Sequence, residues 1–296
     1  MSVIHCDLCV IGGGSAGLSL AAVASQMGAN VVLFEGHRMG GDCLNSGCIP
    51  SKTLLAEARR WQNSADPKVR YREAKAAVRK AIQAIEPHDS VARFEGLGVH
   101  VISAEAHFVG PRTVEGGGLT VVGRRVAIAT GSRPRIPDIR GLEAIEYWTT
   151  DTLFEQDEWP AELIILGGGA IGFEMAQAHV RLGSSVTVIE PNLLLARDEP
   201  TLVSGLRASL EAEGVRFLVG QSVTEVCREA NGRATLTLAN GEVVSGDRVL
   251  LASGRLPNIE RLNLEAAGVR VNASGIVTDK RLRTTARGVF AMGDVA

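Results

Sequence analysis

The stretch Leu8-Cys9-Val10-Ile11-Gly12-Gly13-Gly14-Ser15-Ala16-Gly17 decides the fold of this chain, because residues 163–172 repeat its pattern. In both stretches an apolar run leads into three glycines spaced as GxGxxG. Equivalent glycines differ by 155 positions (167 − 12), and the chain shows this offset throughout the two stretches. A single GxGxxG is weak evidence, but two copies in register, each following an apolar run, strongly indicate a duplicated strand–turn–helix unit. The glycines concerned are Gly12, Gly14 and Gly17 in the first copy and Gly167, Gly169 and Gly172 in the second.

Each copy ends on an acidic residue at the end of the next apolar strand, Glu35 in the first and Glu190 in the second. Glycines at these positions let the backbone turn tightly and approach a pyrophosphate, which then rests on the N-terminus of the following helix. The carboxylate accepts hydrogen bonds from a ribose hydroxyl. Two such units therefore predict two dinucleotide sites. At the second, the acidic Glu190 followed by Pro191 and Asn192 disfavours a 2′-phosphate, so NAD is expected there rather than NADP.

The pattern predicts an α/β protein of two Rossmann-like three-layer domains, the second inserted in the first. We expect the first domain over 1–150, the second over 151–271, and a return segment of the first domain over 272–296. A strand over 289–292 is predicted in that return segment.

Composition excludes several function classes. The 296 residues are 45% hydrophobic and 22% charged, with a net charge of −2, which gives no reason to expect nucleic acid or an anionic membrane as a partner. No apolar run approaches the ~20 residues needed to cross a bilayer. The N-terminus shows no basic segment or cleavage site, so a reducing cytoplasm is expected. The basic residues between 59 and 80 are predicted to form a solvated helical face.

Two cysteines, Cys43 and Cys48, have four residues between them in Gly41-Asp42-Cys43-Leu44-Asn45-Ser46-Gly47-Cys48-Ile49-Pro50-Ser51-Lys52. A disulfide closing so small a ring stabilises the chain by only about 2 kcal/mol. Pro50 favours a helix start, and a helix N-terminus together with Lys52 favours the thiolate form of Cys48. This arrangement indicates redox chemistry. By contrast, Cys6 and Cys9 lie in the first apolar strand and Cys227 in a later one, where core filling or inert roles are expected.

At this point the sequence resembles the flavoprotein disulfide reductases, which include dihydrolipoamide dehydrogenase, mercuric reductase and glutathione reductase. The resemblance covers essentially the whole chain, and the form of the cysteine segment is most similar to the dihydrolipoamide dehydrogenase and mercuric reductase-like branch. It implies a flavin-dependent NAD(P)H:disulfide oxidoreductase, most like dihydrolipoamide dehydrogenase. The motifs that carry it, besides the two glycine units, are the Cys43–Cys48 segment, Ala129-Thr130-Gly131, Gly254-Arg255-Leu256-Pro257-Asn258 and Gly293-Asp294.

The resemblance also assigns residues to cofactors. The residues implied for FAD are Gly12, Gly14, Ser15, Ala16, Gly17, Glu35, Gly41, Asp42, Lys52, Thr130, Gly131 and Asp294. Those implied for the nicotinamide dinucleotide are Gly167, Gly169, Ile171, Gly172, Glu190, Gly254 and Arg255. Cys48 is implied as the thiol beside the flavin and Cys43 as the outer thiol that exchanges with substrate. Lys52 and Glu174 are implied as a pair near the two cofactor rings. No metal site is implied.

The resemblance also defines what we do not find in this chain. In the family, a C-terminal domain forms the homodimer and supplies a His–Glu base to the thiol site of the partner, and neither is present in these residues. We therefore expect a truncated form of a longer enzyme, with a small-molecule disulfide, dithiol or other electron acceptor as its partner. Three alternatives stay open: a dihydrolipoamide dehydrogenase-like enzyme, a mercuric reductase-like enzyme, and a nucleotide-binding scaffold without turnover.

Overall fold

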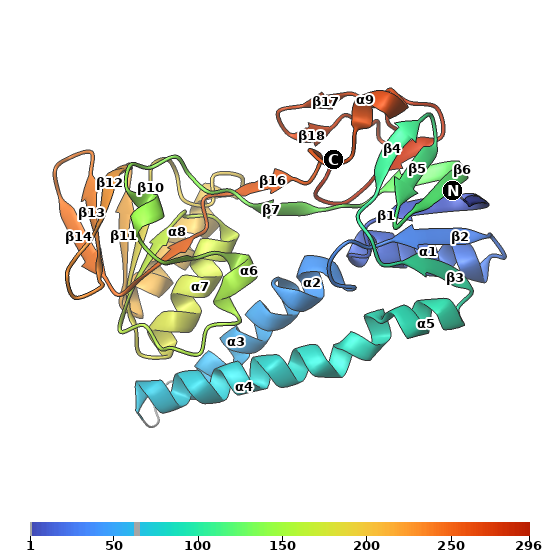
Figure 1. Ribbon diagram of the computed structural model, residues 1–296. Coiled ribbons are helices and arrows are strands. Elements are labelled where there is room, and N and C mark those ends of the chain that lie inside the picture. Colours follow the sequence, from blue (N-terminus) through green and yellow to red (C-terminus); the bar gives the residue numbers. More distant parts are fainter. Residues whose placement is uncertain (1, 62–65) are drawn as a thin grey trace. The chain divides into compact units, whose positions relative to one another are not determined.

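A computed structural model describes residues 2–61 and 66–296. By their contacts these residues form two compact units. Unit 1 comprises the residues up to Asn45 together with Ile82–Arg133 and Arg255–Ala296, and unit 2 comprises Ser46–Ala81 and Pro134–Gly254. Figure 1 shows the elements of both.

Unit 1 is built on a seven-stranded sheet in the order β3-β2-β1-β6-β5-β4, with β19 pairing with β6. The pairs that join β3, β2, β1, β6 and β19 are parallel, whereas β4, β5 and β6 form an antiparallel meander. The strands are β1 (Val3–Ile11), β2 (Val31–Phe34), β3 (Val99–Ile102), β4 (His107–Gly110), β5 (Thr113–Gly116), β6 (Leu119–Ile128) and β19 (Val289–Ala291). The helices are α1 (Ser15–Gln26), α2 (Gly41–Asn45), α5 (Val91–Gly96), α9 (Leu264–Ala267) and the 3₁₀ helix η1 (Glu86–Asp89). Short paired strands are β7 (Ser132–Pro134) with β16 (Arg255–Pro257), and β17 (Val271–Asn272) with β18 (Gly275–Ile276).

Unit 2 has a five-stranded, fully parallel sheet in the order β11-β10-β9-β15-β8 and an antiparallel three-stranded sheet, β12-β13-β14. The parallel strands are β8 (Tyr147–Trp148), β9 (Glu162–Leu166), β10 (Ser185–Glu190), β11 (Val215–Val219) and β15 (Arg248–Leu251). The antiparallel strands are β12 (Val223–Arg228), β13 (Ala234–Leu238) and β14 (Val243–Gly246). The helices are α3 (Cys48–Trp61), α4 (Pro67–Ile85), α6 (Thr150–Leu153), α7 (Ala170–Arg181), α8 (Pro200–Ala212) and the 3₁₀ helix η2 (Leu142–Ala144). The divide between the units falls near the end of α4.

The central strands read as unbroken apolar runs because both faces of a parallel sheet are covered. All four residues of β2 are buried, and β9 is buried from Leu163 to Leu166. β-branched and aliphatic side chains fill these positions, which suits a pleated surface packed on both sides. The α/β class and the two Rossmann-like sheets predicted from the glycine repeat are confirmed, and so is the strand predicted near residue 290.

The unit boundaries differ from the predicted 1–150, 151–271 and 272–296. The second unit begins at Pro134 and ends at Gly254, and it also takes in Ser46–Ala81. That segment belongs there because α3 packs against α7, a contact between residues far apart in the sequence. Strand and turn signals mark the ends of elements, but they do not reveal which sheet a helix covers.

One part of the basic stretch between 59 and 80 is not the solvated face that was predicted. Lys75, in the middle of α4, is fully buried. Its Nζ donates a hydrogen bond to the carbonyl oxygen of Leu153 at 2.7 Å and lies 5.8 Å from the ring centroid of Tyr71. Tyr71 and His179 are buried beside it, with ring centroids 5.9 Å apart. The side of α4 that carries Tyr71, Ala74, Lys75 and Val78 faces the core, while Arg72, Arg79 and Lys80 are exposed.

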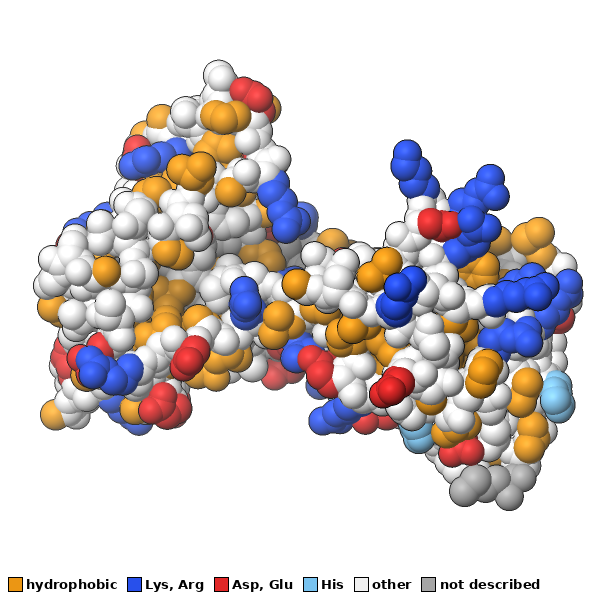
Figure 2. All heavy atoms as spheres, turned by 90° about the horizontal axis from the view of Figure 1, so that it is seen from above, with side chains coloured by type: hydrophobic (Ala, Val, Ile, Leu, Met, Phe, Trp, Pro, Cys, Tyr) orange, Lys and Arg blue, Asp and Glu red, His pale blue; other side chains and the backbone are white. Residues whose placement is uncertain are grey.

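Charged side chains of both signs and scattered apolar ones share the face of the molecule drawn in Figure 2. None of the helices described in residues 2–61 and 66–296 is long and apolar enough to span a membrane.

Candidate functional site

The first glycine turn connects β1 to α1. Gly12 has φ +109°, and its N–H donates to the carbonyl oxygen of Phe34 at 2.8 Å. A Cβ at Gly12 would collide with the backbone of Ala129, and one at Gly17 would collide with the carbonyl oxygen of Gly12. Both positions therefore need glycine, the first for its positive φ and both for the close approach of backbone.

The second turn, between β9 and α7, repeats this geometry. Gly167 has φ +124° and donates to the carbonyl oxygen of Ile189 at 2.9 Å, and Gly172 approaches the carbonyl oxygen of Gly167 as Gly17 approaches that of Gly12. The two N-cap glycines have the same backbone angles, φ −84° and ψ −175°, at Gly14 and at Gly169. The sequence repeat at offset 155 is therefore a repeat of backbone conformation.

The two acidic residues are held in matching ways. Glu35 accepts hydrogen bonds from the backbone N–H groups of Gly13 and His37, both at 2.6 Å. Glu190 accepts them from Gly168 at 2.7 Å and from Asn192 at 2.8 Å. In each turn one carboxylate oxygen binds the glycine loop and the other binds the residue two positions further on. The carboxylates are thus fixed at the ends of β2 and β10, and each oxygen keeps lone pairs for a further donor.

These turns form two cradles for a phosphate-bearing dinucleotide. Neither α1 nor α7 has a side-chain cap on its first turn, so its backbone N–H groups are available to a ligand. The helix dipole adds a partial positive charge at the same point, which favours an anion. Ser15, Ala16 and Ile171 lie in the first turns of these helices, where the sequence places them. The residues present fit a dinucleotide in both units.

Gly40 and Gly41 pack against the backbone of the first cradle. The N–H of Gly40 donates to the carbonyl oxygen of Gly13 at 2.8 Å, and a Cβ at Gly41 would collide with the Cα of Gly14. Gly41 has φ +56° and begins α2, which carries Asp42 and Cys43. The thiol of Cys43 is therefore tied through a short helix to the turn that would hold the pyrophosphate. Cys43 is partly buried.

A polar network in unit 1 brings together residues predicted for different cofactors. The Ser132 hydroxyl donates to Asp294 at 3.0 Å, and Arg255 Nε donates to that hydroxyl at 2.7 Å. Arg255 also forms an ion pair with Asp42. The resemblance implied Arg255 for the nicotinamide dinucleotide, but the structure places its guanidinium beside Asp42 and Asp294, two residues predicted for FAD. The divide between the two units falls between Gly254 and Arg255.

The segments around Thr130 and Asn258 are clamped together in unit 1. Thr130 Oγ1 donates to the carbonyl oxygen of Asn258 at 2.7 Å, and Asn258 Nδ2 donates to the carbonyl oxygen of Thr130 at 2.9 Å. The N–H of Asn258 also donates to the carbonyl oxygen of Gly131 at 2.9 Å. These reciprocal bonds explain why Ala129-Thr130-Gly131 and the Gly254–Asn258 motif occur together in the sequence. Sequence reasoning missed Ser132, which directly follows Gly131 and is buried.

Cys48 lies in unit 2 at the start of α3, two residues earlier than the helix start predicted from Pro50, and its side chain is exposed. The N–H of Ser51 donates to the carbonyl oxygen of Gly47 at 3.0 Å, which closes the first turn. Cys43 is partly buried, whereas Cys48 is exposed. The divide between the two units, at Asn45 and Ser46, falls between these two cysteines.

Lys52 and Glu174 are paired, as the resemblance implied. Lys52 Nζ lies 2.7 Å from Oε1 and 2.9 Å from Oε2 of Glu174. Both residues belong to unit 2, Lys52 on α3 and Glu174 on α7, and this pair accompanies the packing of the two helices. Glu174 lies two residues beyond Gly172, so the ion pair links the cysteine-bearing helix to the helix of the second cradle.

Of the remaining cysteines, Cys6 and Cys9 have the core-filling environment that was expected of them. Cys6 and Cys9 lie in β1 within the core, and burial raises the pKa of the Cys6 thiol to about 11 and raises that of Cys9 further. Cys227 is an exposed residue of β12. In the part of the chain that the structure describes, no three His, Cys, Asp or Glu side chains come together as a metal-binding group.

Comparison with known proteins agrees with this architecture. A family described as pyridine nucleotide-disulphide oxidoreductase matches residues 6–296. The mercuric reductases of Acidithiobacillus ferrooxidans and Staphylococcus aureus are 34% and 32% identical, covering 97% and 98% of this chain and 55% of each relative. A solved structure of the HOCl-induced flavoprotein disulfide reductase RclA from Escherichia coli, a Cu(II) complex, has 30% identity and a TM-score of 0.88 and covers 97% of this chain and 66% of that one. The chain thus spans about half the length of the curated relatives it matches.

Proposed function

Because the chain belongs to the pyridine nucleotide-disulphide oxidoreductase family, we propose that it carries the electron-input half of a flavin-dependent NAD(P)H:disulfide oxidoreductase. Electrons would pass between a nicotinamide, FAD and a disulfide formed by Cys43 and Cys48. The observation that carries the proposal is the duplicated cradle: two uncapped helix N-termini, each with a glycine turn and a carboxylate fixed by two backbone N–H groups. A protein that binds a single nucleotide would not need the second cradle.

FAD would occupy the cradle of unit 1 and the nicotinamide dinucleotide that of unit 2. Glu35 would accept a hydrogen bond from the adenosine ribose of the flavin, while Ser132, Arg255 and Asp294 supply polar contacts in the same unit. When bound, the flavin supplies the two-electron step between hydride and thiols. The protein residues position the dinucleotides and hold charge near them. No residue of the chain needs to change oxidation state apart from the cysteines.

The thiol chemistry can be written in balance. NADH and one proton reduce the Cys43–Cys48 disulfide to two thiols, with release of NAD⁺. The Cys43 thiolate then attacks a substrate disulfide, forming a mixed disulfide and releasing one substrate thiol. Cys48 displaces the second substrate thiol and restores the protein disulfide. One feature favours these roles: Cys48 lies in the first turn of a 14-residue helix, and a helix N-terminus stabilises a thiolate.

We propose NADH as the preferred nucleotide. Glu190 carries a negative charge at the position of the ribose, and both of its oxygens are held by backbone N–H groups, so it cannot swing away from a 2′-phosphate without losing those bonds. NADH should reduce the protein at least tenfold faster than NADPH at equal concentration. Comparable rates with the two nucleotides would contradict this assignment.

A small-molecule disulfide or dithiol is the proposed substrate class. Within this class we propose dihydrolipoamide, because the resemblance implies an enzyme most like dihydrolipoamide dehydrogenase. Reduction of a thiophilic metal ion is a second candidate, which the names of the mercuric reductase relatives and the Cu(II) complex of RclA favour. The whole parent enzyme is proposed to be a homodimer, and the cytoplasm is its proposed location. A nucleotide-binding scaffold without turnover remains the alternative for this chain.

One anaerobic titration tests the proposal. Purified protein reconstituted with FAD is mixed with NADH, and its visible spectrum is recorded. A flavin spectrum that develops a long-wavelength thiolate–flavin band supports the proposal, whereas protein that does not retain flavin defeats it for this chain. We expect Cys48→Ser to abolish the band and Cys43→Ser to show it without NADH. Equal behaviour of the two variants would overturn the assigned roles.

A further inference from the structure

Unit 2 contains a cavity of about 940 Å³ that the proposed function does not use. Its volume lies within the range of small-molecule sites. Helix α4 forms one wall, and the β12–β13 hairpin, the 157–161 segment and the residues before β15 form the others. All of its described lining residues belong to unit 2.

The cavity is lined by many basic side chains. Lys68, Arg72 and Arg79 lie on α4, spaced four and seven residues apart so that they share one helix face. Arg228 ends β12 on another wall, and Arg233 and Arg248 complete the set. The acidic lining residues are Glu146, Asp157, Glu158 and Asp247.

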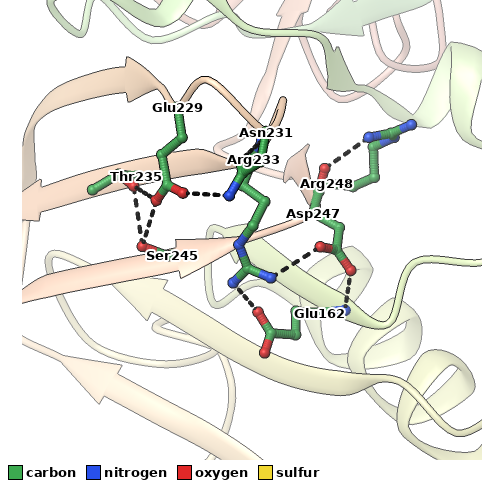
Figure 3. A network of polar contacts seen from close by, with 8 residues as sticks. All are labelled: Glu162, Glu229, Asn231, Arg233, Thr235, Ser245, Asp247 and Arg248. Carbon is green, nitrogen blue, oxygen red and sulfur yellow. Dashed lines mark hydrogen bonds and ion pairs between the residues drawn. The ribbon is translucent and has the colours of Figure 1, made fainter.

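Three of the basic residues are already engaged by acids. Arg79 Nη1 lies 2.5 Å from Asp157 Oδ1, and Arg248 forms an ion pair with Glu158. Figure 3 shows Arg233 between Glu162 and Asp247; its Nη1 lies 3.2 Å from Asp247 Oδ1. These pairs line the cavity with fixed, neutralised groups.

The hairpin is itself fixed. The N–H of Arg233 donates to Asn231 Oδ1 at 2.9 Å, and Asn231 donates to Glu229 at 3.0 Å (Figure 3). The hydrogen bond that Arg233 donates to Glu162 raises the pKa of the Arg233 guanidinium. Hydrogen bonds thus connect residues 229, 231 and 233 within this wall of the cavity.

The other three basic residues have no such partner. Among the residues that the structure describes, Lys68, Arg72 and Arg228 are exposed and make no side-chain hydrogen bond or ion pair. Of the acidic lining residues named above, Glu146 is the one that takes no part in these ion pairs. Once the pairs are set aside, three positive charges remain against one negative charge, and they come from two walls of the same cavity.

We propose that this cavity binds a small molecule carrying a diphosphate group, held between Arg72 and Lys68 of α4 and Arg228 of β12. A diphosphate matches the excess positive charge, and the planar guanidinium groups can each bind a phosphate through two N–H groups. Trp159, which is half-buried, also lines the cavity and supplies aromatic surface beside the basic residues. The group could come from free pyrophosphate or from a nucleoside diphosphate. This inference does not rest on the proposed oxidoreductase function.

Calorimetric titration with pyrophosphate tests the site, with FAD and NADH present at saturation so that both glycine cradles are filled. The double variant Arg72→Gln/Arg228→Gln removes one charge from each of two walls. The matched control is Arg59→Gln/Lys80→Gln, which removes two exposed charges of unit 2 that do not line the cavity. We expect at least a tenfold loss of pyrophosphate affinity in the first variant and less than a twofold change in the second.

Equal losses of pyrophosphate affinity in the two variants would overturn the proposal. So would a titration in which the unaltered protein binds pyrophosphate no better than chloride at equal ionic strength. Titration with ADP and with adenosine identifies the source of the phosphates. ADP binding as tightly as pyrophosphate supports the site. ADP binding more tightly than pyrophosphate also supports it and indicates an additional contact between the protein and the base. Adenosine binding as tightly as ADP would show that the basic residues are not the ligand contacts.

Discussion

Replacing Lys75 with Met should stabilise unit 2 at neutral pH. Burial lowers the pKa of Lys75 from 10.5 to about 7, an effect that the charge of Asp157 partly opposes. In the unfolded chain the amine keeps its ordinary pKa and stays protonated up to about pH 10. Folding at pH 7 must therefore either release this proton or bury the charge, which costs about 4 kcal/mol at 1.36 kcal/mol per unit of pKa difference.

Methionine keeps the length and apolar stem of lysine but not the amine. The substitution removes the hydrogen bond that Lys75 donates to the carbonyl oxygen of Leu153, so this oxygen loses its donor. An unsatisfied buried acceptor costs about 2 kcal/mol. Lys75→Met should therefore raise the free energy of unfolding at pH 7 by about 2 kcal/mol, the difference between the two terms.

The sign of the effect should change with pH. A base whose folded pKa lies below its unfolded value destabilises the fold fully below the folded pKa, and this destabilisation disappears as pH rises toward the unfolded pKa. At pH 9 the remaining cost of the wild-type lysine is about 2 kcal/mol, so the substitution should be neutral there. At pH 10 it should be destabilising by about 1 kcal/mol.

Denaturant unfolding followed by tryptophan fluorescence measures this directly, because all three tryptophans of the chain, Trp61, Trp148 and Trp159, lie in unit 2. Lys80→Met, at an exposed position of the same helix, is the control and should change the stability by less than about 0.5 kcal/mol. A loss of stability in Lys75→Met at every pH would refute the reasoning. It would mean that the rings of Tyr71 and Phe154, 5.8 and 5.7 Å away, hold the ammonium more strongly than burial opposes it.

Three further outcomes can be checked on the same material. Gly172→Ala should abolish nucleotide binding by unit 2 and unfold it at lower denaturant, because its Cβ would collide with the Gly167 carbonyl, whereas Gly205→Ala in α8 meets open space and should stabilise by about 0.5–1 kcal/mol in the same assay. The Arg181–Glu213 pair lowers the pKa of Glu213, so its contribution is fully present above the ordinary pKa of 4.5 and is lost as pH falls through the lowered pKa of the folded state; Arg181→Gln should cost about 1 kcal/mol at pH 7 and progressively less on acidification through that range, measured by thermal unfolding. Cys9 should resist iodoacetamide at pH 8 in the native protein and react in guanidinium chloride, as mass spectrometry of its peptide would show.

The glycine turns and their acidic partners could be predicted from the sequence because the whole device is local. Strand, turn, helix and the next strand fit within about 30 residues, and each glycine has a steric reason that does not depend on distant chain. The pairing of Lys52 with Glu174 also followed, through the resemblance.

The placement of Arg255 and Lys75 could not be predicted in this way. Arg255 directly follows Gly254, yet its partners Asp42 and Ser132 are more than 120 residues away. Lys75 lies in a stretch whose composition reads as solvent-exposed, and only the packing of α4 in unit 2 buries it. Both depend on tertiary contacts, which outweigh local composition.

The backbone bonds of Glu190 have a consequence for how this protein could change its nucleotide preference. The side chain that would select the ribose is also the acceptor for the N–H groups of Gly168 and Asn192. Replacing it with a basic residue to admit a 2′-phosphate would therefore remove two hydrogen bonds from the cradle itself. A cofactor switch in unit 2 would require a new acceptor in the turn at the same time as a new charge. Single-residue exchanges at this position should therefore yield loosened proteins rather than proteins of altered specificity, which makes the present preference difficult to change one step at a time.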